Sequence, residues 1–241
     1  MASPLEQFTI KPLIPINLGG VDASLTNSGA FMLATVAAIT FFLMLGMRKK
    51  ALVPGRWQSM SELSYEFIAS MIKDNVGNEG RKYFPFIFSL FMFILFANLI
   101  GLIPYSFTFT SHIIVTFAMA MMVFIGVTIV GIIRHGLHFF SFFVPKGVPA
   151  VMLPLLVPIE ILSYLSRPLS LSIRLFANMM AGHTMMKVFA GFIIPLGFLG
   201  GWAPLAVDVA LTGFEFLVAF LQAYVFTVLA CLYLNDAIHL H

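Results

Sequence analysis

The chain contains a long stretch, residues 83–133, without a single Asp, Glu, Lys or Arg. Soluble domains have about 25% charged residues, so a run of this kind does not build a water-facing surface. A membrane-spanning helix needs about 20 apolar residues, and the stretch therefore predicts two spans, at 84–104 and 112–133. The whole chain agrees, because it is 60% hydrophobic and only 10% charged. We predict an all-α polytopic membrane protein.

The N-terminal part predicts an arm and one further span. Residues 1–28 lack the basic start and apolar core of a signal peptide and predict an extended arm interrupted by prolines and glycines. These are Pro4, Pro12, Pro15, Gly19 and Gly20. Residues 29–47 predict the first span. Lys and Arg near a span end favour the inner side, so the basic residues at 48–50 and Arg56 predict an N-terminus outside.

Residues 57–77 predict a different kind of helix. Apolar side chains recur there at three-to-four spacing, while acids and bases occupy other positions. The apolar positions are Trp57, Met60, Leu63, Phe67, Met71 and Ile72. This pattern predicts an amphipathic helix lying on the inner membrane interface. Ser59 and Glu62 have capping-box spacing, which predicts the start of the helix.

The basic residues give the chain a consistent orientation. They gather at 48–56, 73–82 and 134–146, whereas residues 105–111 carry no charge. By the positive-inside rule, three spans then carry the chain from outside to inside. Counting the two helices that follow places the C-terminus inside as well.

Two C-terminal segments are too long for upright spans. A continuous helix over 148–192 would be about 65 Å long, roughly twice the hydrocarbon thickness of a bilayer. It therefore either breaks into two helices or lies strongly tilted, and its first half contains Pro154, Pro158 and Pro168. An uncharged turn at 193–204 and a helix at 205–238 follow. We expect about five membrane-embedded helices in one domain, residues 1–241.

Ionisable residues inside a membrane are costly and usually functional, and this chain concentrates its own in the last two helices. They are Glu160, Arg167, Arg174, His183, Lys187, Asp208 and Glu215. Several follow a seven-residue spacing, which offsets side chains by only about 20° around a helix. The same stripes include Ser163, Ser170, Asn178 and Gln222. Two striped helices joined by a turn predict a hairpin facing a partner or a water-filled path.

Arg174 most needs an explanation. Its neighbours are apolar, and no acid lies within 13 residues on either side. A guanidinium stays ionised in proteins, so its counter-charge must come from elsewhere in the fold or from another chain.

The other charges have simpler alternatives. Arg167 and Lys187 either belong to the polar stripe or snorkel towards an interface. Asp208 is either part of the path or a solvated acid near a helix end. His183 and Glu215 suit a proton relay, since both side chains titrate when perturbed. In a straight helix, however, His183 points about 180° away from Arg174, so a bend or a second crevice is required.

Other chemistries find no support in the sequence. Its single cysteine, Cys231, excludes an internal disulfide and a cysteine-built metal site. No Walker A, GxGxxG or GxSxG motif is present, so we expect no nucleotide chemistry on this chain. The isoelectric point near 9.1 reflects dispersed basic residues, not a nucleic-acid surface. His135 and His138 predict loop histidines, and we expect no metal and no other cofactor.

The C-terminal hairpin resembles a known family. The signature of subunit a of the rotary F-type ATP synthases resembles residues 165–183, which read "LSRPLSLSIRLFANMMAGH". The final-helix signature of that subunit resembles residues 214–234, "FEFLVAFLQAYVFTVLACLYL". The branch shared by mitochondria and alphaproteobacteria is similar in "SPLEQFTI" and "IGLIPYSFTFTSH". The resemblance covers nearly the whole chain.

The resemblance implies a proton-carrying stator that packs beside a ring of c subunits, each with a buried carboxylate. The family's essential arginine matches Arg174, and its two long helices lie tilted along the ring. Its outer half-channel residues match four positions: Asn178, His183, Glu215 and Gln222. Its inner half-channel acid matches Glu160, near three serines: Ser163, Ser166 and Ser170. Asp208 and His112 are further candidates. The acid and imidazole at 215 and 183 look exchanged relative to some bacterial members, as in the mitochondrial type.

The resemblance also implies the surroundings of the chain. The implied partners are the c ring, peripheral-stalk b subunits, the rest of the ATP synthase and membrane lipid, without nucleic acid. The implied location is a bacterial plasma membrane or a mitochondrial inner membrane, and the subunit is not catalytic on its own. A stand-alone ion-coupled transporter is one alternative, although no inverted repeat is visible. A passive scaffold is another, but a scaffold does not need Arg174 in the bilayer.

Overall fold

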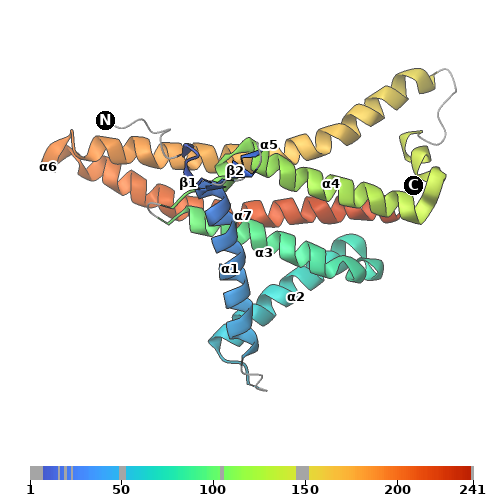
Figure 1. Cartoon of the computed structure of the whole chain (residues 1–241), viewed down its shortest axis with the longest axis horizontal. Helices are drawn as coiled ribbons and strands as arrows, with labels where there is room; N and C mark the ends of the chain where they lie inside the picture. Colours follow the sequence, from blue (N-terminus) through green and yellow to red (C-terminus); the bar gives the residue numbers. More distant parts are fainter. Residues whose placement is uncertain are drawn as a thin grey trace.

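The structure is a computed structural model that describes residues 8–15, 17–18, 21–22, 24–48, 53–103, 106–144 and 152–239. It is built almost entirely from helices (Figure 1). Four of the described helices are long and apolar enough to cross a membrane: Asn27–Met47, Asn78–Gly101, Ile113–His135 and Trp202–Ile238. The predicted all-α polytopic membrane fold is confirmed. Several residues used in the predictions lie outside the described ranges: Pro4, Gly19, Gly20, Lys49, Lys50, Pro104 and Lys146.

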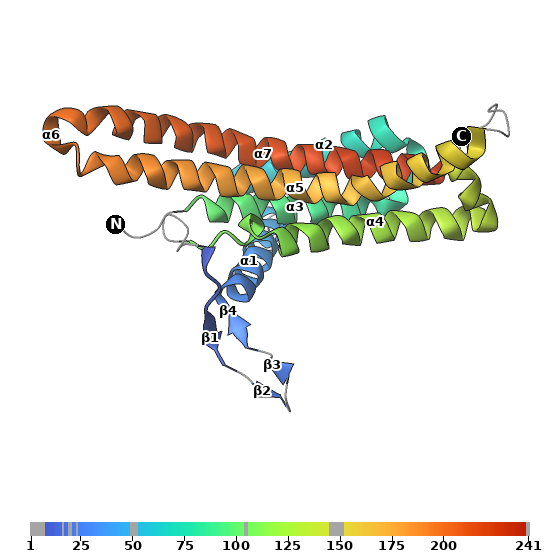
Figure 2. The same cartoon turned by 90° about the horizontal axis from the view of Figure 1, so that it is seen from above.

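The described part of the predicted arm folds back on itself. Strand β1 (Pro12–Ile14) pairs antiparallel with β4 (Leu25–Thr26), and β2 (Asn17–Leu18) pairs with β3 (Val21–Asp22). The Asn27 side chain holds the base of this hairpin, because its Oδ1 accepts from the Lys11 amide at 3.1 Å. Figure 2 shows the strands projecting from the helices. Of the described breakers, Pro12 begins β1 and Pro15 directly follows it.

Helix α1 (Asn27–Met47) follows the strands directly. Its start is capped by Thr26, whose hydroxyl accepts from the Gly29 amide at 3.3 Å. In Figure 1 this helix crosses the long C-terminal helices at a steep angle. Only three of its residues are buried, Ser28, Thr35 and Gly46, which suits a helix that also contacts lipid.

Helix α2 (Arg56–Val76) begins earlier than its capping-box spacing indicates. Its N-cap is Gly55, and no side chain caps it. Ser59 is already inside the helix, with its amide bonded to the Gly55 carbonyl at 2.8 Å. Glu62 instead accepts from Gln58 at 2.8 Å. The capping-box prediction is therefore wrong, because an i,i+4 side-chain pair competes for the same acid.

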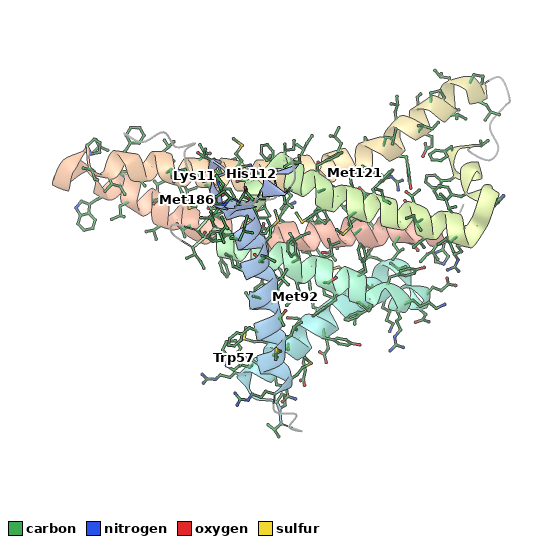
Figure 3. All side chains as sticks on the ribbon, viewed as in Figure 1. Lys11, Trp57, Met92, His112, Met121 and Met186 are labelled. Carbon is green, nitrogen blue, oxygen red and sulfur yellow. The ribbon has the colours of Figure 1, made fainter. Side chains whose placement is uncertain are left out.

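The apolar face of α2 is divided between two environments. Its C-terminal half buries Ile68 and Ile72 in the main hydrophobic core of the protein. Its N-terminal half leaves Trp57, Met60 and Leu63 more than half exposed. Trp57 is labelled in Figure 3, at the far end of α2 from its buried half. An apolar but uncovered half-face fits the predicted interfacial position.

The middle of the chain forms two long helices. After the short helix η2 (Asn78–Tyr83) come α3 (Phe84–Gly101), η3 (Phe109–Ser111), α4 (Ile113–His135) and η4 (Gly136–Phe143). Two contacts connect the end of α4 to other parts of the chain. Arg134 at the end of α4 forms an ion pair with Glu79 of η2. His135 lies 3.1 Å from the carbonyl of Ile238, near the C-terminus. The ends predicted to lie inside therefore meet.

The last two long helices form a hairpin. Helix α5 (Leu153–Ile193) and helix α7 (Trp202–Ile238) are joined by the short α6 (Gly197–Gly200) and run side by side in both views (Figures 1 and 2). Of the two alternatives for residues 148–192, the structure has one continuous helix over the described part. Pro158 and Pro168 lie within it, where each removes a backbone hydrogen bond. The first part of α5 turns away from α7 in Figure 1.

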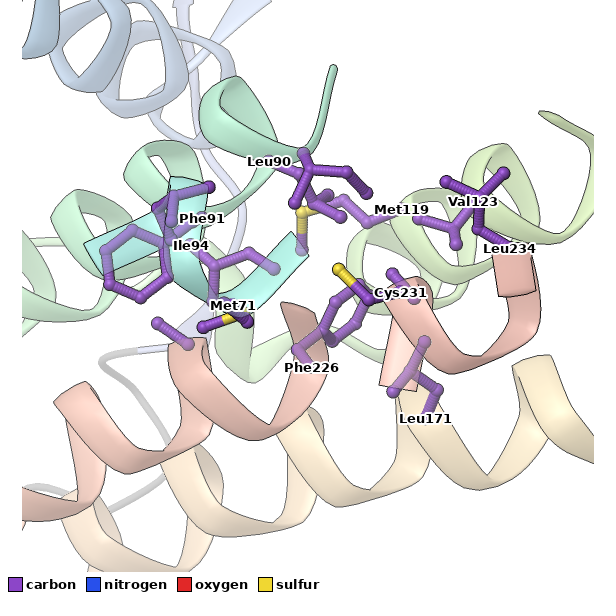
Figure 4. Packing of buried hydrophobic residues seen from close by; sticks show 14 of the residues in the cluster. Met71, Leu90, Phe91, Ile94, Met119, Val123, Leu171, Phe226, Cys231 and Leu234 are labelled. Atoms are coloured by element: carbon purple, nitrogen blue, oxygen red, sulfur yellow. The ribbon is translucent and has the colours of Figure 1, made fainter. Parts of the chain in front are cut away.

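Helix α7 is the centre of the core. It contacts α2, α3, α4 and α5, and small side chains let these helices approach: Ala219, Ala223, Ala230 and Cys231 are fully buried. Phe226 fills the space between them, as Figure 4 shows. Cys231 thus packs as a small apolar side chain, and the hairpin is fixed to the rest of the protein through α7.

Candidate functional site

A cleft of about 440 Å³ lies between α5 and α7. Four predicted site residues line it: Arg174, Asn178, Glu215 and Gln222. The remaining lining is largely apolar and includes Met185, Leu211 and Phe214. The polar stripes of the two helices therefore meet, as their heptad spacing predicts, and they meet where apolar side chains surround them.

Arg174 occupies the exposed side of α5. Its neighbours Leu171 and Leu175 are buried in the core, whereas Ile173 is 44% exposed. Within the described residues Arg174 makes no hydrogen bond and no ion pair. The sequence allowed a counter-charge either from elsewhere in the fold or from another chain, and the described part of the fold supplies none.

The middle of the cleft contains a polar bridge between the helices. Asn178 donates through Nδ2 to Oε1 of Gln222 at 2.8 Å. Gln222 is 3% exposed, and its Nε2 has no partner among the described residues. Asn98 of α3 reaches the same region, since its amide donates to the Ala219 carbonyl at 3.4 Å while its Oδ1 is unpaired. Buried unpaired polar atoms of this kind are suited to bind water.

Glu215 and His183 form a second polar group behind the cleft. Both are buried, and His183 Nε2 lies 3.8 Å from Glu215 Oε1. The same nitrogen lies 3.1 Å from the hydroxyl of Thr108. Neither carboxylate oxygen of Glu215 has a hydrogen-bond partner within the described structure.

His183 does not line the cleft, which agrees with its position opposite Arg174 on α5. Glu215 lines the cleft and also approaches His183. No bend of α5 or second crevice is therefore needed, because Glu215 of α7 is close both to His183 and to the cleft that contains Arg174.

The predicted inner residues lie elsewhere on α5. Glu160 is half-buried, and its three serines (Ser163, Ser166 and Ser170) are exposed. The Ser166 hydroxyl donates to the Ser163 carbonyl at 2.7 Å. None of the four lines the cleft around Arg174. The structure therefore separates this group from the outer one, with Arg174 between them in sequence.

Two further candidates lie near the outer group. Asp208 is half-buried, and its Oδ1 has no partner among the described residues. It is therefore less solvated than a free acid at a helix end. His112 precedes α4, is labelled in Figure 3, and stacks on Phe107 with 5.3 Å between ring centroids. Its Nε2 is also buried and unpaired within the described chain.

Arg167 has a partner that the sequence analysis missed. Its guanidinium bonds to Asp236 at 2.9 Å and lies over the ring of Tyr233 at 5.0 Å. Tyr164 and Phe142 also contact its face. The charge of Arg167 is therefore paired within the fold. Lys187, in contrast, is exposed.

Sequence spacing had no means of finding Asp236, Thr108 or Asn98. Each lies 69 or more residues along the chain from its partner. Asn98 and Thr108 are polar residues in an uncharged run, and this was the one sequence signal for a role in the site. The signal is weak, because other polar residues of the run bond only to their own helix.

The comparison with known proteins is consistent along the chain. The family described as ATP synthase A chain matches residues 29–235. ATP synthase subunit a of Paramagnetospirillum magneticum is 58% identical over 247 residues, covering 100% of both chains. That of Pelagibacter ubique is 59% identical, covering 99% of this chain and 98% of its own. The Rhodospirillum rubrum subunit is 57% identical over 241 residues, with full coverage of both. This chain belongs to the ATP synthase A chain family.

Proposed function

We propose that this subunit is the proton-carrying stator of an F-type ATP synthase. In this proposal Arg174 faces a ring of c subunits and receives their carboxylates one at a time. One observation carries it: Arg174 is exposed, lines the largely apolar cleft between α5 and α7, and has no counter-charge among the described residues. A guanidinium is a permanent cation in proteins, so such a site suits an acid supplied by another chain.

The energetics follow from the environment of the ring carboxylate. Facing lipid, that acid is protonated, because an isolated anion in hydrocarbon costs several kcal/mol. Facing Arg174 it ionises, because a nearby opposite charge favours the charged form. Arg174 therefore removes the proton on one side and prevents a returning ring site from passing while protonated.

Two separate paths supply and remove the proton. The outer path consists of His183 and Glu215, with Asn178 and Gln222 between them and Arg174, and the unpaired atoms of this group are suited to hold water. Asp208 and His112 belong to its outer end. The inner path consists of Glu160 and its serines. Because the two groups lie apart on α5, no continuous wire lets protons cross without turning the ring.

The positions of the helix ends support an orientation in which the inner path and the C-terminus lie on the inner side of the membrane. The ion pair of Arg134 with Glu79 and the contact of His135 with Ile238 gather basic ends at one side. The uncharged turn at α6 lies at the other end of the hairpin in Figure 1. Basic residues concentrate on the inner side of membranes. The amphipathic α2 then lies on the inner interface, and the N-terminal strands lie outside.

The proposal assigns partners to the uncovered faces. The exposed face of α5 that bears Arg174 packs on the c ring, and the weakly covered α1 lies among lipid and the b subunits of the peripheral stalk. The proposed location of the protein is an energy-transducing membrane.

The deciding experiment uses the whole complex in vesicles. We expect Arg174→Ala to abolish ATP-driven proton pumping, and Arg174→Lys to be a poor substitute because an ammonium lacks the planar, weakly hydrated fork. Lys187→Ala, an exposed cation on the same helix, is the control. Normal pumping by assembled Arg174→Ala complexes would refute the proposal.

A further inference from the structure

The segment between α3 and α4 contributes a side chain to the outer group. Thr108 lies just before η3 and is 6% exposed. Its hydroxyl is 3.1 Å from His183 Nε2 and 3.2 Å from the Gly101 carbonyl. Within the described chain, this is the one side-chain hydrogen bond that joins a proposed proton-path residue to an element other than α5 and α7.

We propose that Thr108 is a positioning residue of the outer proton path, which holds His183 Nε2 and releases it for transfer to Glu215. The inference rests on the proposed function, since it specifies how one step of that path is controlled. It adds a residue from the α3–α4 connection to a path otherwise built from the C-terminal hairpin.

The hydroxyl has one proton and two neighbours, so it has two arrangements. The Gly101 carbonyl only accepts, and when Thr108 donates to it the hydroxyl oxygen is free to accept from a protonated Nε2. When Nε2 is bare, the hydroxyl turns and donates to the ring instead. Gly101 then keeps its second donor, the Ser106 hydroxyl at 3.0 Å. Each arrangement satisfies one protonation state of His183.

Glu215 competes with Thr108 for the same nitrogen. At 3.8 Å, its Oε1 is beyond hydrogen-bond distance from Nε2, and both its oxygens are unpaired among the described residues. In the transfer step, an imidazolium gives its Nε2 proton to the Glu215 carboxylate. The products are a neutral imidazole protonated on Nδ1 and a carboxylic acid. The Thr108 hydroxyl then donates to the bare Nε2 and stabilises the product.

The position of Thr108 is fixed by its surroundings. A methyl group at Gly101 would lie 2.8 Å from Thr108 Cγ2, so the end of α3 leaves room for this side chain. The Thr108 carbonyl accepts from the Ser111 hydroxyl at 2.5 Å. Phe107 and Phe109 on either side are buried. A hydroxyl held this firmly sets the direction of the imidazole it bonds.

The test reconstitutes the assembled complex in vesicles and then removes its catalytic head. Passive proton flux through the remaining membrane sector is measured. Thr108→Val keeps the shape and removes the hydroxyl. We expect the flux to fall about tenfold, the equivalent of one lost hydrogen bond to a charged group. Thr108→Ser should restore most of it. Thr116→Val is the control, because Thr116 is equally buried but bonds only to its own helix, at the Ile113 carbonyl.

Three results would overturn the inference: an unchanged flux in Thr108→Val, an equal loss in Thr108→Val and Thr108→Ser, or an equal loss in Thr116→Val. If the valine variant does not assemble, Thr108→Ala gives the same comparison with serine. Glu215→Gln, measured in parallel, distinguishes failure of the role of Thr108 from failure of the outer path. Flux lost there but intact in Thr108→Val refutes only the role of Thr108, whereas flux intact in Glu215→Gln refutes the outer path itself.

Discussion

Glu215 connects two polar groups that lie on different sides of α5. It lines the cleft that contains Arg174 and Asn178, and it lies 3.8 Å from His183, which is outside that cleft. Without a side chain at this position, the histidine and the arginine would face away from each other. In the proposed path, Glu215 is therefore the residue that connects His183 to the cleft of Arg174.

Replacing Glu215 tests this connection. We expect Glu215→Gln, which keeps the shape but cannot accept a proton, to reduce proton uptake from outside by about a hundredfold or more. Lys187→Ala should have little effect, since Lys187 is exposed and outside the path. The measurement is proton flux in vesicles driven by a membrane potential. Equal effects of the two substitutions would remove Glu215 from the path.

Gly182 is required for the position of that carboxylate. A Cβ added to Gly182 would lie 2.8 Å from the Glu215 Cδ, and closer still to Oε1. We expect Gly182→Ala to displace the carboxylate and lower proton flux about ten- to a hundredfold, although alanine favours the helix. Gly191→Ala on the same helix is the control, because nothing lies within 4 Å of its added Cβ. If both variants conduct alike, the close approach is unimportant.

At the level of the elements, long uncharged runs and heptad spacing were informative. They predict the spans and the hairpin because burial in lipid acts on whole segments and is insensitive to details. The start of α2 was not predictable in the same way, since Glu62 pairs with Gln58 instead of capping. Nor was the pairing of Arg167 with Asp236, because tertiary packing alone brings them together.

The pairing of Arg167 with Asp236 ties α5 to the C-terminal end of α7. Its aromatic surroundings exclude much of the water that would otherwise solvate the guanidinium. We expect Asp236→Asn to lower the melting temperature of the purified complex by about 2–4 °C, because a lone charge remains. The double variant Arg167→Gln/Asp236→Asn should be less affected than the single one. A double variant as unstable as the sum of both single variants would show that the pair is not coupled.

At the scale of the whole molecule, the proposal has one face of the hairpin contact another chain. The core side of α5 is fixed by α4 and α7, while its other side exposes apolar residues around Arg174. In apolar surroundings, a charge that lacks a partner in its own fold is costly unless water or another chain compensates it. In the proposed assembly, this face of α5 is therefore one half of the interface with the ring.

In the proposed assembly, this face of α5 lies against a ring of carboxylate-bearing subunits. Ala177 is exposed, about one turn from Arg174, and the native Cys231 is fully buried. The most direct measurement is therefore disulfide cross-linking of Ala177→Cys to a ring subunit with a cysteine near its carboxylate, with Val36→Cys on α1 as control. A disulfide needs Cα atoms within about 7 Å. We predict an adduct for Ala177→Cys alone, with loss of ATP-driven pumping on oxidation. No adduct, or an equal adduct at Val36→Cys, would contradict the account.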